Sequence, residues 1–272
     1  MSGWDATLEL SFARRRERTT MVRRLHQGPL MVQSPFYPGD GTCHVYVLHP
    51  PGGIAGGDRL HTRLTTAPGA QVLTTTPAAS KFYRTTGPAG EQHQRIEVDA
   101  NGSFEWVPQE SLVFDGARAR STTQVELSPS ARFFGWETWA LGRPARGEHF
   151  SHGSIDQTLD VRIGGSPVLI ERMRMGAADD FKDAPWGLGG HCAFTTAYAY
   201  PADVGTLDLV RHFLEQAEEV ATAGATLLGK LLVVRGLGTG TRTLISWQRA
   251  LWALLRPSVL GLDACPPRVW AT

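Results

Sequence analysis

Hydrophobic and polar side chains alternate along most of the first 175 residues, as they do in β-strands. Residues 4–12 give the clearest example, because Trp4, Ala6, Leu8 and Leu10 alternate with polar side chains. This segment is expected to be a half-buried strand. The same reasoning predicts short strands at 30–33, 60–66, 72–76, 111–114, 119–127, 131–139, 154–163 and 167–175, a strand that begins at Cys43, and two strands within 91–110.

Turn signals separate these segments and indicate the class of fold. Pro68-Gly69 and Asn101-Gly102 both favour tight turns, with a strand on each side. The segments between them are rich in threonine, which favours sheet over helix. Many short strands at this spacing predict a mainly β fold. No linker is evident, so we expect a single domain over residues 1–272.

A helical period begins after about residue 205. Leu207, Val210 and Leu214 recur at intervals of three to four residues, which gives one apolar face. Thr206 is a plausible N-cap for this helix and Gly224 a plausible end.

A buried strand at 230–236 and a second amphipathic helix at 243–257, ended by Pro257, complete the chain. The sequence therefore predicts a β body over 1–204, closed by a helix–strand–helix unit over 205–272. The glycines of 236–240 lack the spacing of a dinucleotide-binding motif, so a tight turn between strand and helix is expected there.

Charge and composition exclude several classes of function. The chain has 27 Lys and Arg residues against 26 Asp and Glu, a balance that gives no electrostatic case for a nucleic-acid or membrane partner. No apolar run approaches the length of a membrane span, and no signal peptide is evident. The three cysteines are far apart and form no CxxC motif, so a disulfide framework is not expected. A cytoplasmic location is the simplest expectation.

The segment 43–58, CHVYVLHPPGGIAGGD, is the most unusual in the chain. It begins as a strand and continues as a loop whose prolines remove backbone donors and whose glycines permit positive φ. A loop with such specific backbone chemistry is expected to be tightly packed or functional. Its carboxylate, Asp58, could cap a turn or face a cavity. The other candidate residues of the loop are His49, Pro50, Pro51, Gly52, Gly53, Gly56 and Gly57.

Candidate metal donors are present, but none has a recognised ligand spacing. Cys43 and His44 could bind nickel or zinc, yet successive residues of a strand point to opposite faces and cannot bind one ion together. A core or rim position is the alternative for each of them. The G-x-S-x-G motif of many serine hydrolases is absent.

Several motifs, in order along the chain, resemble the UreD (UreH) family of urease accessory proteins. HPPGGIAGGD and SKFYR are the most specific. The resemblance covers most of residues 3–175 and becomes looser in the C-terminal third. The matching segments are GWDATLEL, GPLMVQSPFYP, CHVYVLHPPGGIAGGD, LTTTPAASKFYRTTG, EWVPQE, FDGARAR, WETWALGRPARGEHFSHG and LIERMR.

This resemblance implies a function in assembly and no enzymatic activity. Proteins of this family bind apo-urease and work with UreF and UreG to deliver nickel to the urease active site. The family fold is a helical stack of β-strands with two helices. The resemblance therefore implies protein partners and transient nickel, with no tightly bound cofactor.

The resemblance also implies a set of site residues along an internal polar tunnel. By position in the matched motifs these are Asp58, Ser80, Glu137 and Glu171. Oxygen donors suit such a path, because they hold a divalent ion weakly whereas thiolates and imidazoles would retain it.

Two alternatives to metal transfer remain at this point. The chain could be a structural adaptor that holds apo-urease open, in which case Asp58→Ala would leave the nickel content of urease unchanged. It could also be a metal-dependent hydrolase, which would need three protein ligands and an open coordination position.

Overall fold

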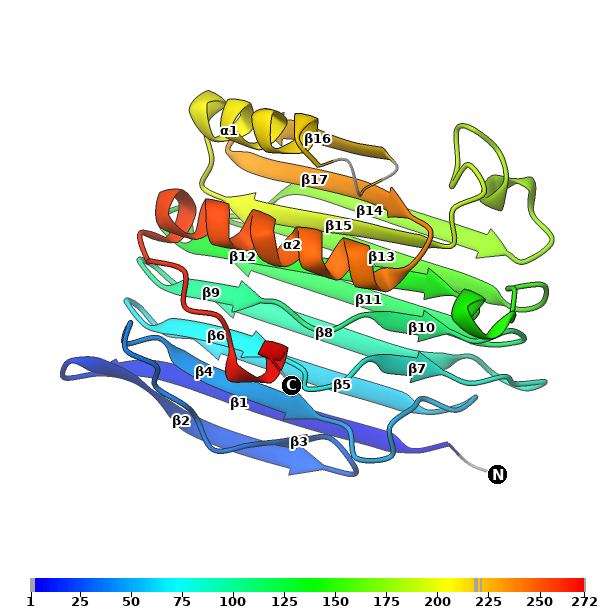
Figure 1. Ribbon diagram of the computed structural model, residues 1–272. Coiled ribbons are helices and arrows are strands. Elements are labelled where there is room, and N and C mark those ends of the chain that lie inside the picture. Colours follow the sequence, from blue (N-terminus) through cyan, green and yellow to red (C-terminus); the bar gives the residue numbers. More distant parts are fainter. Residues whose placement is uncertain (1–2, 218–219, 221, 272) are drawn as a thin grey trace.

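The computed structural model describes residues 3–217, 220 and 222–271. These residues form two facing β-sheets, here called sheet I and sheet II, with helices against the outer face of sheet II (Figure 1). The mainly β fold and its stacked-coil arrangement are as predicted.

Sheet I has the strand order β14-β13-β11-β8-β5-β1-β2. Its pairs β1–β5, β5–β8, β8–β11 and β11–β13 are parallel, and the outermost pair at each end is antiparallel. The strand bounds are β1 Asp5–Arg15, β2 Arg18–Gln27, β5 Arg59–Thr66, β8 Gly90–Val98, β11 Arg118–Leu127, β13 Ser154–Ile163 and β14 Ser166–Gly176.

Sheet II has the order β16-β17-β15-β12-β9-β6-β4-β3, and the short pair β7–β10 extends it beside β12. Its central pairs β4–β6, β6–β9 and β9–β12 are parallel. The bounds are β3 Met31–Val32, β4 Cys43–Leu48, β6 Gln71–Thr75, β7 Ser80–Phe82, β9 Ser103–Trp106, β10 Ser111–Val113, β12 Arg132–Leu141, β15 Ala193–Tyr200, β16 Thr222–Leu228 and β17 Leu231–Gly238.

The chain alternates between the two sheets, so that successive coils stack on one another (Figure 1). The predicted turns at Pro68-Gly69 and Asn101-Gly102 are present, and Gly69 and Asn101 both have positive φ. Each turn joins a strand of sheet I to a strand of sheet II. The sequence pattern alone does not distinguish such a connection between two sheets from a hairpin within one sheet. Hydrogen bonds then connect each strand to the next coil of the same sheet.

Two hydrophobic clusters hold these layers together. The first fills the space between the sheets and includes Leu8, Phe12, Phe133 and Trp139, all essentially inaccessible to solvent. The second lies between sheet II and the helices and includes Trp136, Trp247, Trp252, Leu251 and Leu255. Sheet II is therefore buried on both faces over its centre, which explains the continuous burial of β12.

The C-terminal region differs from the prediction in its boundaries. Helix α1 spans Val204–Glu215, and its N-cap is Asp203, whose side chain accepts a hydrogen bond from the Thr206 backbone N–H at 2.8 Å. Thr206 was predicted as the N-cap and instead occupies the third helical position. Gly224 was predicted to end this helix but lies within strand β16. The C-terminal region is therefore helix–strand–strand–helix.

Helix α2, Thr241–Leu255, follows the predicted tight turn after β17. Pro257 does not end the helical conformation, because a π-helical turn over Arg256–Leu260 follows α2. The proline lies near the start of this turn, where no backbone donor is needed. Short 3-10 turns cover Pro144–Arg146, Asp180–Lys182 and Arg268–Ala271. Strand β15 was not assigned from the sequence. Among the described residues, none of the helices is both long and apolar enough to cross a bilayer.

A buried ion-pair cluster attaches the end of α2 to sheet II. Arg256 has no exposed side-chain surface and lies 3.0 Å from Glu105 of β9 and 2.7 Å from Asp40. The indole N–H of Trp252 donates to Glu105 at 2.5 Å. Because the guanidinium of Arg256 contacts both carboxylates, none of the three charges is buried without a partner. The cluster thereby fixes the position of the C-terminal helix.

Candidate functional site

A row of polar side chains runs through the interior on the inner face of sheet I. The strand register places Thr62, Gln94, Thr123, Leu159 and Glu171 opposite one another on β5, β8, β11, β13 and β14. Thr62 and Thr123 are buried. Leu159 is the one apolar residue among these five, whereas the next row on one side belongs entirely to the cluster between the sheets and consists of Leu64, Ile96, Val125, Val161 and Leu169.

Sheet II contributes a second polar row, on β12, β15 and β17. The register places Glu137, Thr196 and Arg235 opposite one another. Glu137 lies in phase with Phe133 and Trp139, which belong to the cluster between the sheets, and so it faces sheet I.

Glu137 connects the two rows. Its carboxyl group accepts hydrogen bonds from the Thr123 hydroxyl and from the Gln157 amide of sheet I, the latter at 2.5 Å. Only 8% of the residue is exposed. Burial raises the pKa of Glu137 above its ordinary value, although the hydrogen bonds from Thr123 and Gln157 oppose the shift. The neutral form of the carboxyl group is therefore favoured in this interior position.

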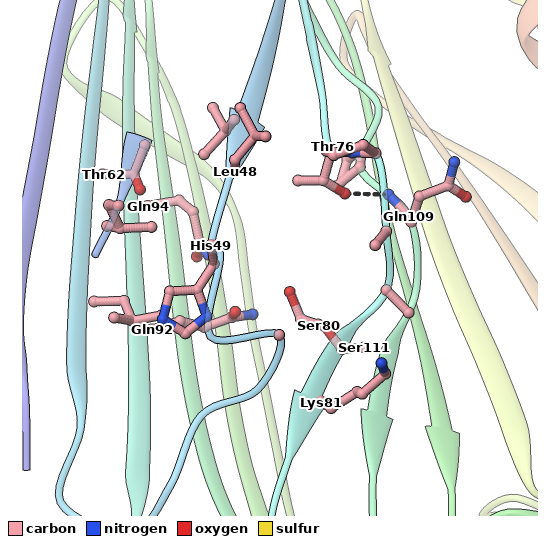
Figure 2. A pocket seen from close by; sticks show the side chains of 18 of the residues that line it. Leu48, His49, Thr62, Thr76, Ser80, Lys81, Gln92, Gln94, Gln109 and Ser111 are labelled. Atoms are coloured by element: carbon pink, nitrogen blue, oxygen red, sulfur yellow. Dashed lines mark hydrogen bonds between the residues drawn. The ribbon is translucent and has the colours of Figure 1, made fainter. Parts of the chain in front are cut away.

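A cavity of about 320 Å³ lies between the sheets and extends to Glu137. Figure 2 shows His49, Thr62, Gln92 and Gln94 on one side of this cavity and Ser80, Lys81, Thr76, Gln109 and Ser111 on the other. Most of its polar groups are neutral oxygen and nitrogen atoms. Apolar side chains such as Val47, Leu60 and Trp139 make up much of the wall, and the polar groups among them can hold water.

His49 lies at the end of the strand that leads into the glycine-rich loop. Its Nε2 is buried and has no hydrogen-bond partner among the described residues. Burial lowers the pKa of His49, and the carboxylate of nearby Asp58 opposes the shift. The imidazole therefore favours its neutral form beside the cavity.

The glycines of the loop permit close packing against the next coil. A Cβ atom at Gly53 would lie 2.1 Å from the Tyr83 ring, and one at Gly56 would lie 2.1 Å from the Thr85 hydroxyl. Gly57 has a φ of +90°, which other residues rarely adopt. The tight packing predicted for this loop is thus present, and Pro50 and Gly52 line the cavity beside His49.

Asp58 lies at the end of the loop and outside the lining of the cavity. Its two carboxylate oxygens accept hydrogen bonds from the backbone N–H groups of Trp4 and Ala55, each at 2.8 Å. The carboxylate thereby joins the N-terminal strand to the loop. This is the turn-capping arrangement that the sequence left open for Asp58.

The remaining tunnel candidates lie in or near the two polar rows. Ser80 and Glu137 line the same cavity. Glu171 forms an ion pair with Arg235 of β17, and its charge also raises the pKa of Glu137, after the larger effect of burial. Ser80 and Glu137 thus share the cavity, Glu171 lies farther along the inner face of sheet I, and Asp58 lies outside the cavity lining.

The two candidate metal donors of β4 point to opposite sides of sheet II, as expected. Cys43 belongs to the cluster between the sheets, and burial raises the pKa of its thiol to about 11. His44 is 1% exposed, and burial lowers its pKa to about 4. Among the residues that the structure describes, no three or more His, Cys, Asp or Glu side chains are grouped to hold a metal ion.

Sequence reasoning missed the neutral members of the two rows and Arg235. A signal was nevertheless present, because Arg235 occupies a phase of its strand that is otherwise apolar, and Gln94 and Thr123 share the phase of core residues such as Ile96 and Val125. A polar residue in that phase faces the core and needs a partner there.

Comparisons with known proteins agree on one family. The family model of the UreD urease accessory protein matches residues 5–271. A urease accessory protein UreD of Pseudomonas putida is 47% identical over 271 residues, which cover 100% of this chain and 95% of the relative. The UreD protein of Klebsiella aerogenes is 40% identical over 272 residues, which cover 99% of this chain and 97% of the relative. The chain therefore belongs to the UreD urease accessory protein family.

Proposed function

We propose that this chain binds apo-urease in the cytoplasm and, together with UreF and UreG, enables the delivery of nickel to the urease active site. In this proposal nickel is the cargo, and the chain has no catalytic activity of its own. Membership of the UreD family supports a function in urease maturation. The interior of the protein supports the more specific claim that the ion passes through it.

The observation that carries this claim is the buried carboxyl group of Glu137 between two polar rows. Thr62, Gln94 and Thr123 offer neutral oxygens along one wall, and Glu137 is continuous with the cavity that contains Ser80. Carboxylate and carbonyl oxygens bind divalent cations without the strong retention of thiolates. An interior lined in this way is suited to passing an ion onward.

Protonation of Glu137 is part of the proposed mechanism. Because burial favours the neutral carboxyl group, the empty interior does not hold an unpaired negative charge. An arriving Ni²⁺ displaces this proton and binds the carboxylate, and the proton returns when the ion leaves. Thr123 and Gln157 orient the carboxyl group throughout by donating to its oxygens.

The test is the nickel content of urease in cells that carry the chain as wild type, Glu137→Gln or Glu97→Gln. The second variant is a matched control, because Glu97 pairs with Arg63 and Arg95 on the outer face of sheet I. Capture of apo-urease and UreF by each variant is measured in parallel. We expect Glu137→Gln to bind both partners and to deliver less nickel, while Glu97→Gln behaves as wild type.

Full nickel delivery by Glu137→Gln would contradict metal passage and favour the structural adaptor. Failure of the wild-type chain to capture apo-urease and UreF would contradict the assembly function itself. The two outcomes are independent, since one concerns the interior and the other the surface.

A further inference from the structure

One loop projects from the stack of coils and carries the most exposed large hydrophobic side chain that the structure describes. This segment, residues 177–192, connects β14 to β15 and is here called the Trp186 loop (Figure 1). Trp186 is 74% exposed, whereas five of the eight tryptophans of the chain are buried. Tryptophan has one of the largest apolar surfaces of any side chain, and here most of that surface lies in water.

The Trp186 loop is folded onto the body of the protein. Leu188 is buried in the cluster between the sheets, and Phe181 packs against the same cluster. The backbone N–H of Leu188 donates to the Phe181 carbonyl at 2.9 Å, which closes the loop on itself. A second hydrogen bond of 3.0 Å joins the Gly189 N–H to the Ala184 carbonyl. The loop is therefore ordered before any partner binds.

Gly187, the residue after Trp186, fixes the tryptophan on this loop. A Cβ atom at Gly187 would collide with the Phe181 carbonyl oxygen, so only glycine allows the backbone to approach this closely. The Trp186 ring contacts the Phe181 ring edge to face, with the ring centroids 5.8 Å apart. Because the side chain is already held from one side, binding through its free surface costs little conformational entropy.

The charge around Trp186 restricts the class of partner. Residues 177–192 contain three aspartates and one lysine, and the side chains of Asp180 and Asp183 are exposed. Nucleic acids and anionic membranes are negatively charged, so these carboxylates repel them. A side chain that projects from the surface also requires a hollow to enter. The loop therefore suits a protein with an apolar pocket bordered by cationic side chains.

We infer that Trp186 is an anchor for such a protein partner: its indole ring enters an apolar pocket of the partner, and Asp180 and Asp183 pair with basic side chains at the rim. The inference deepens the proposed function, because it assigns one surface of the chain to the assembly. It rests on that function for the partners to be tested, which are apo-urease, UreF and UreG.

The two parts of the contact act on different rate constants. A tryptophan that is fully desolvated in a pocket slows dissociation, whereas charges at the rim accelerate association and respond to salt. Lys182 lies 3.9 Å from Asp183, but this pair is exposed and therefore weak. The Asp183 carboxylate thus remains available to a cationic group of the partner.

Biolayer interferometry with the immobilised full chain tests the anchor. Purified apo-urease, UreF and UreG are applied separately to the wild type, Trp186→Ala and Trp4→Ala. We expect Trp186→Ala to weaken the binding of one of them about thirtyfold, mainly through faster dissociation, because truncating a central tryptophan costs about 2 kcal/mol or more. Trp4 is 51% exposed and lies outside the loop, so Trp4→Ala is the matched control and should change each Kd by less than about twofold.

Charge reversal gives a second readout that removes no packing. The double variant Asp180→Lys and Asp183→Lys should slow association with the same partner about tenfold at low salt, and the difference should shrink as the ionic strength rises. Asp208→Lys is the matched control, because Asp208 is an exposed aspartate of α1. This double variant also tests the loop if Trp186→Ala proves unstable.

Binding that a stably folded Trp186→Ala leaves unchanged for all three proteins would overturn the anchor, and so would an equal loss with Trp4→Ala. An unchanged association rate in the double variant would overturn the basic rim. A wild-type dimer that Trp186→Ala separates would also overturn the inference, because the occupant would then be a second copy of this chain. Failure of the wild-type chain to bind any of the three proteins would contradict the proposed function and the anchor together.

Discussion

Replacing Asp58 with asparagine should reduce the stability of the protein rather than act first on metal transfer. Asp58 is 7% exposed, and its two oxygens accept the backbone N–H groups of Trp4 and Ala55. Asparagine has nearly the same shape and retains one oxygen acceptor. Its NH₂ group, however, faces the second N–H group, which then has no acceptor.

The expected loss follows from these two hydrogen bonds. A hydrogen bond to a charged acceptor contributes about 1.5–3 kcal/mol, and an unsatisfied buried donor costs about 1–3 kcal/mol. Because Asp58→Asn weakens one bond and removes the other, we expect the free energy of unfolding to fall by about 3 kcal/mol. For a chain of this size, this corresponds to a decrease in Tm of about 6–12 °C.

Thermal unfolding followed by circular dichroism measures this decrease. Asp99→Asn is the matched control, because Asp99 accepts a single hydrogen bond from the Ala100 N–H in an exposed turn, and its Tm should change by less than about 2 °C. An Asp58→Asn variant that unfolds at the wild-type Tm but fails to deliver nickel would refute the reasoning. That result would indicate that Asp58 acts directly in metal transfer.

Three further predictions concern other parts of the fold. Glu105→Gln leaves the buried Arg256 without its main partner, so urea denaturation should show a loss of about 3–5 kcal/mol. Burial depresses the pKa of His44 from 6.5 to about 4 in the folded protein. The contribution of the neutral imidazole to the free energy of unfolding is therefore fully present above pH 6.5 and is lost as the pH falls toward 4. The wild-type chain should lose about 3 kcal/mol more than His44→Gln over this range in equilibrium unfolding, and equal losses would contradict the assignment. Gly53→Ala forces its Cβ against the Tyr83 ring and should cost about 1–3 kcal/mol, whereas the same change in a Tyr83→Ala background should cost much less in a double-mutant cycle.

Alternation along the chain was sufficient to predict most strands, because each strand has one face between the sheets. It could not predict which strands pair. The turns at Pro68-Gly69 and Asn101-Gly102 favour a reversal of the chain whether the next strand lies beside the first or in the facing sheet. Pairing of β5 with β8 depends on stacking of complete coils, which is a long-range property.

The C-terminal helix boundaries were missed for a local reason and a tertiary one. Asp203 and Thr206 are both good capping residues, and the structure uses them together, with Asp203 as N-cap. Residues 222–228 have no strong strand pattern, and none of their side chains is buried. Pairing with β17 makes them a strand at the edge of sheet II.

The candidate site could be predicted in part. Glu137 and Arg235 can be recognised from sequence as charged residues in the apolar phase of their strands. The partners of Glu137 cannot, because Thr123 and Gln157 come from the facing sheet, and their distance depends on how the two sheets pack. The resemblance to the UreD family contributed the remaining candidates, and geometry then separated Asp58 from the cavity.

The most direct test of nickel passage is transfer in a purified system. Apo-urease is mixed with the wild-type or Glu137→Gln chain, UreF, UreG and a stoichiometric amount of Ni²⁺, and urease-bound nickel is measured over time. Passage through the interior predicts that Glu137→Gln assembles normally and transfers nickel about tenfold more slowly, since one ligand of the path is lost. Transfer at the wild-type rate by a fully assembled Glu137→Gln complex would contradict the account.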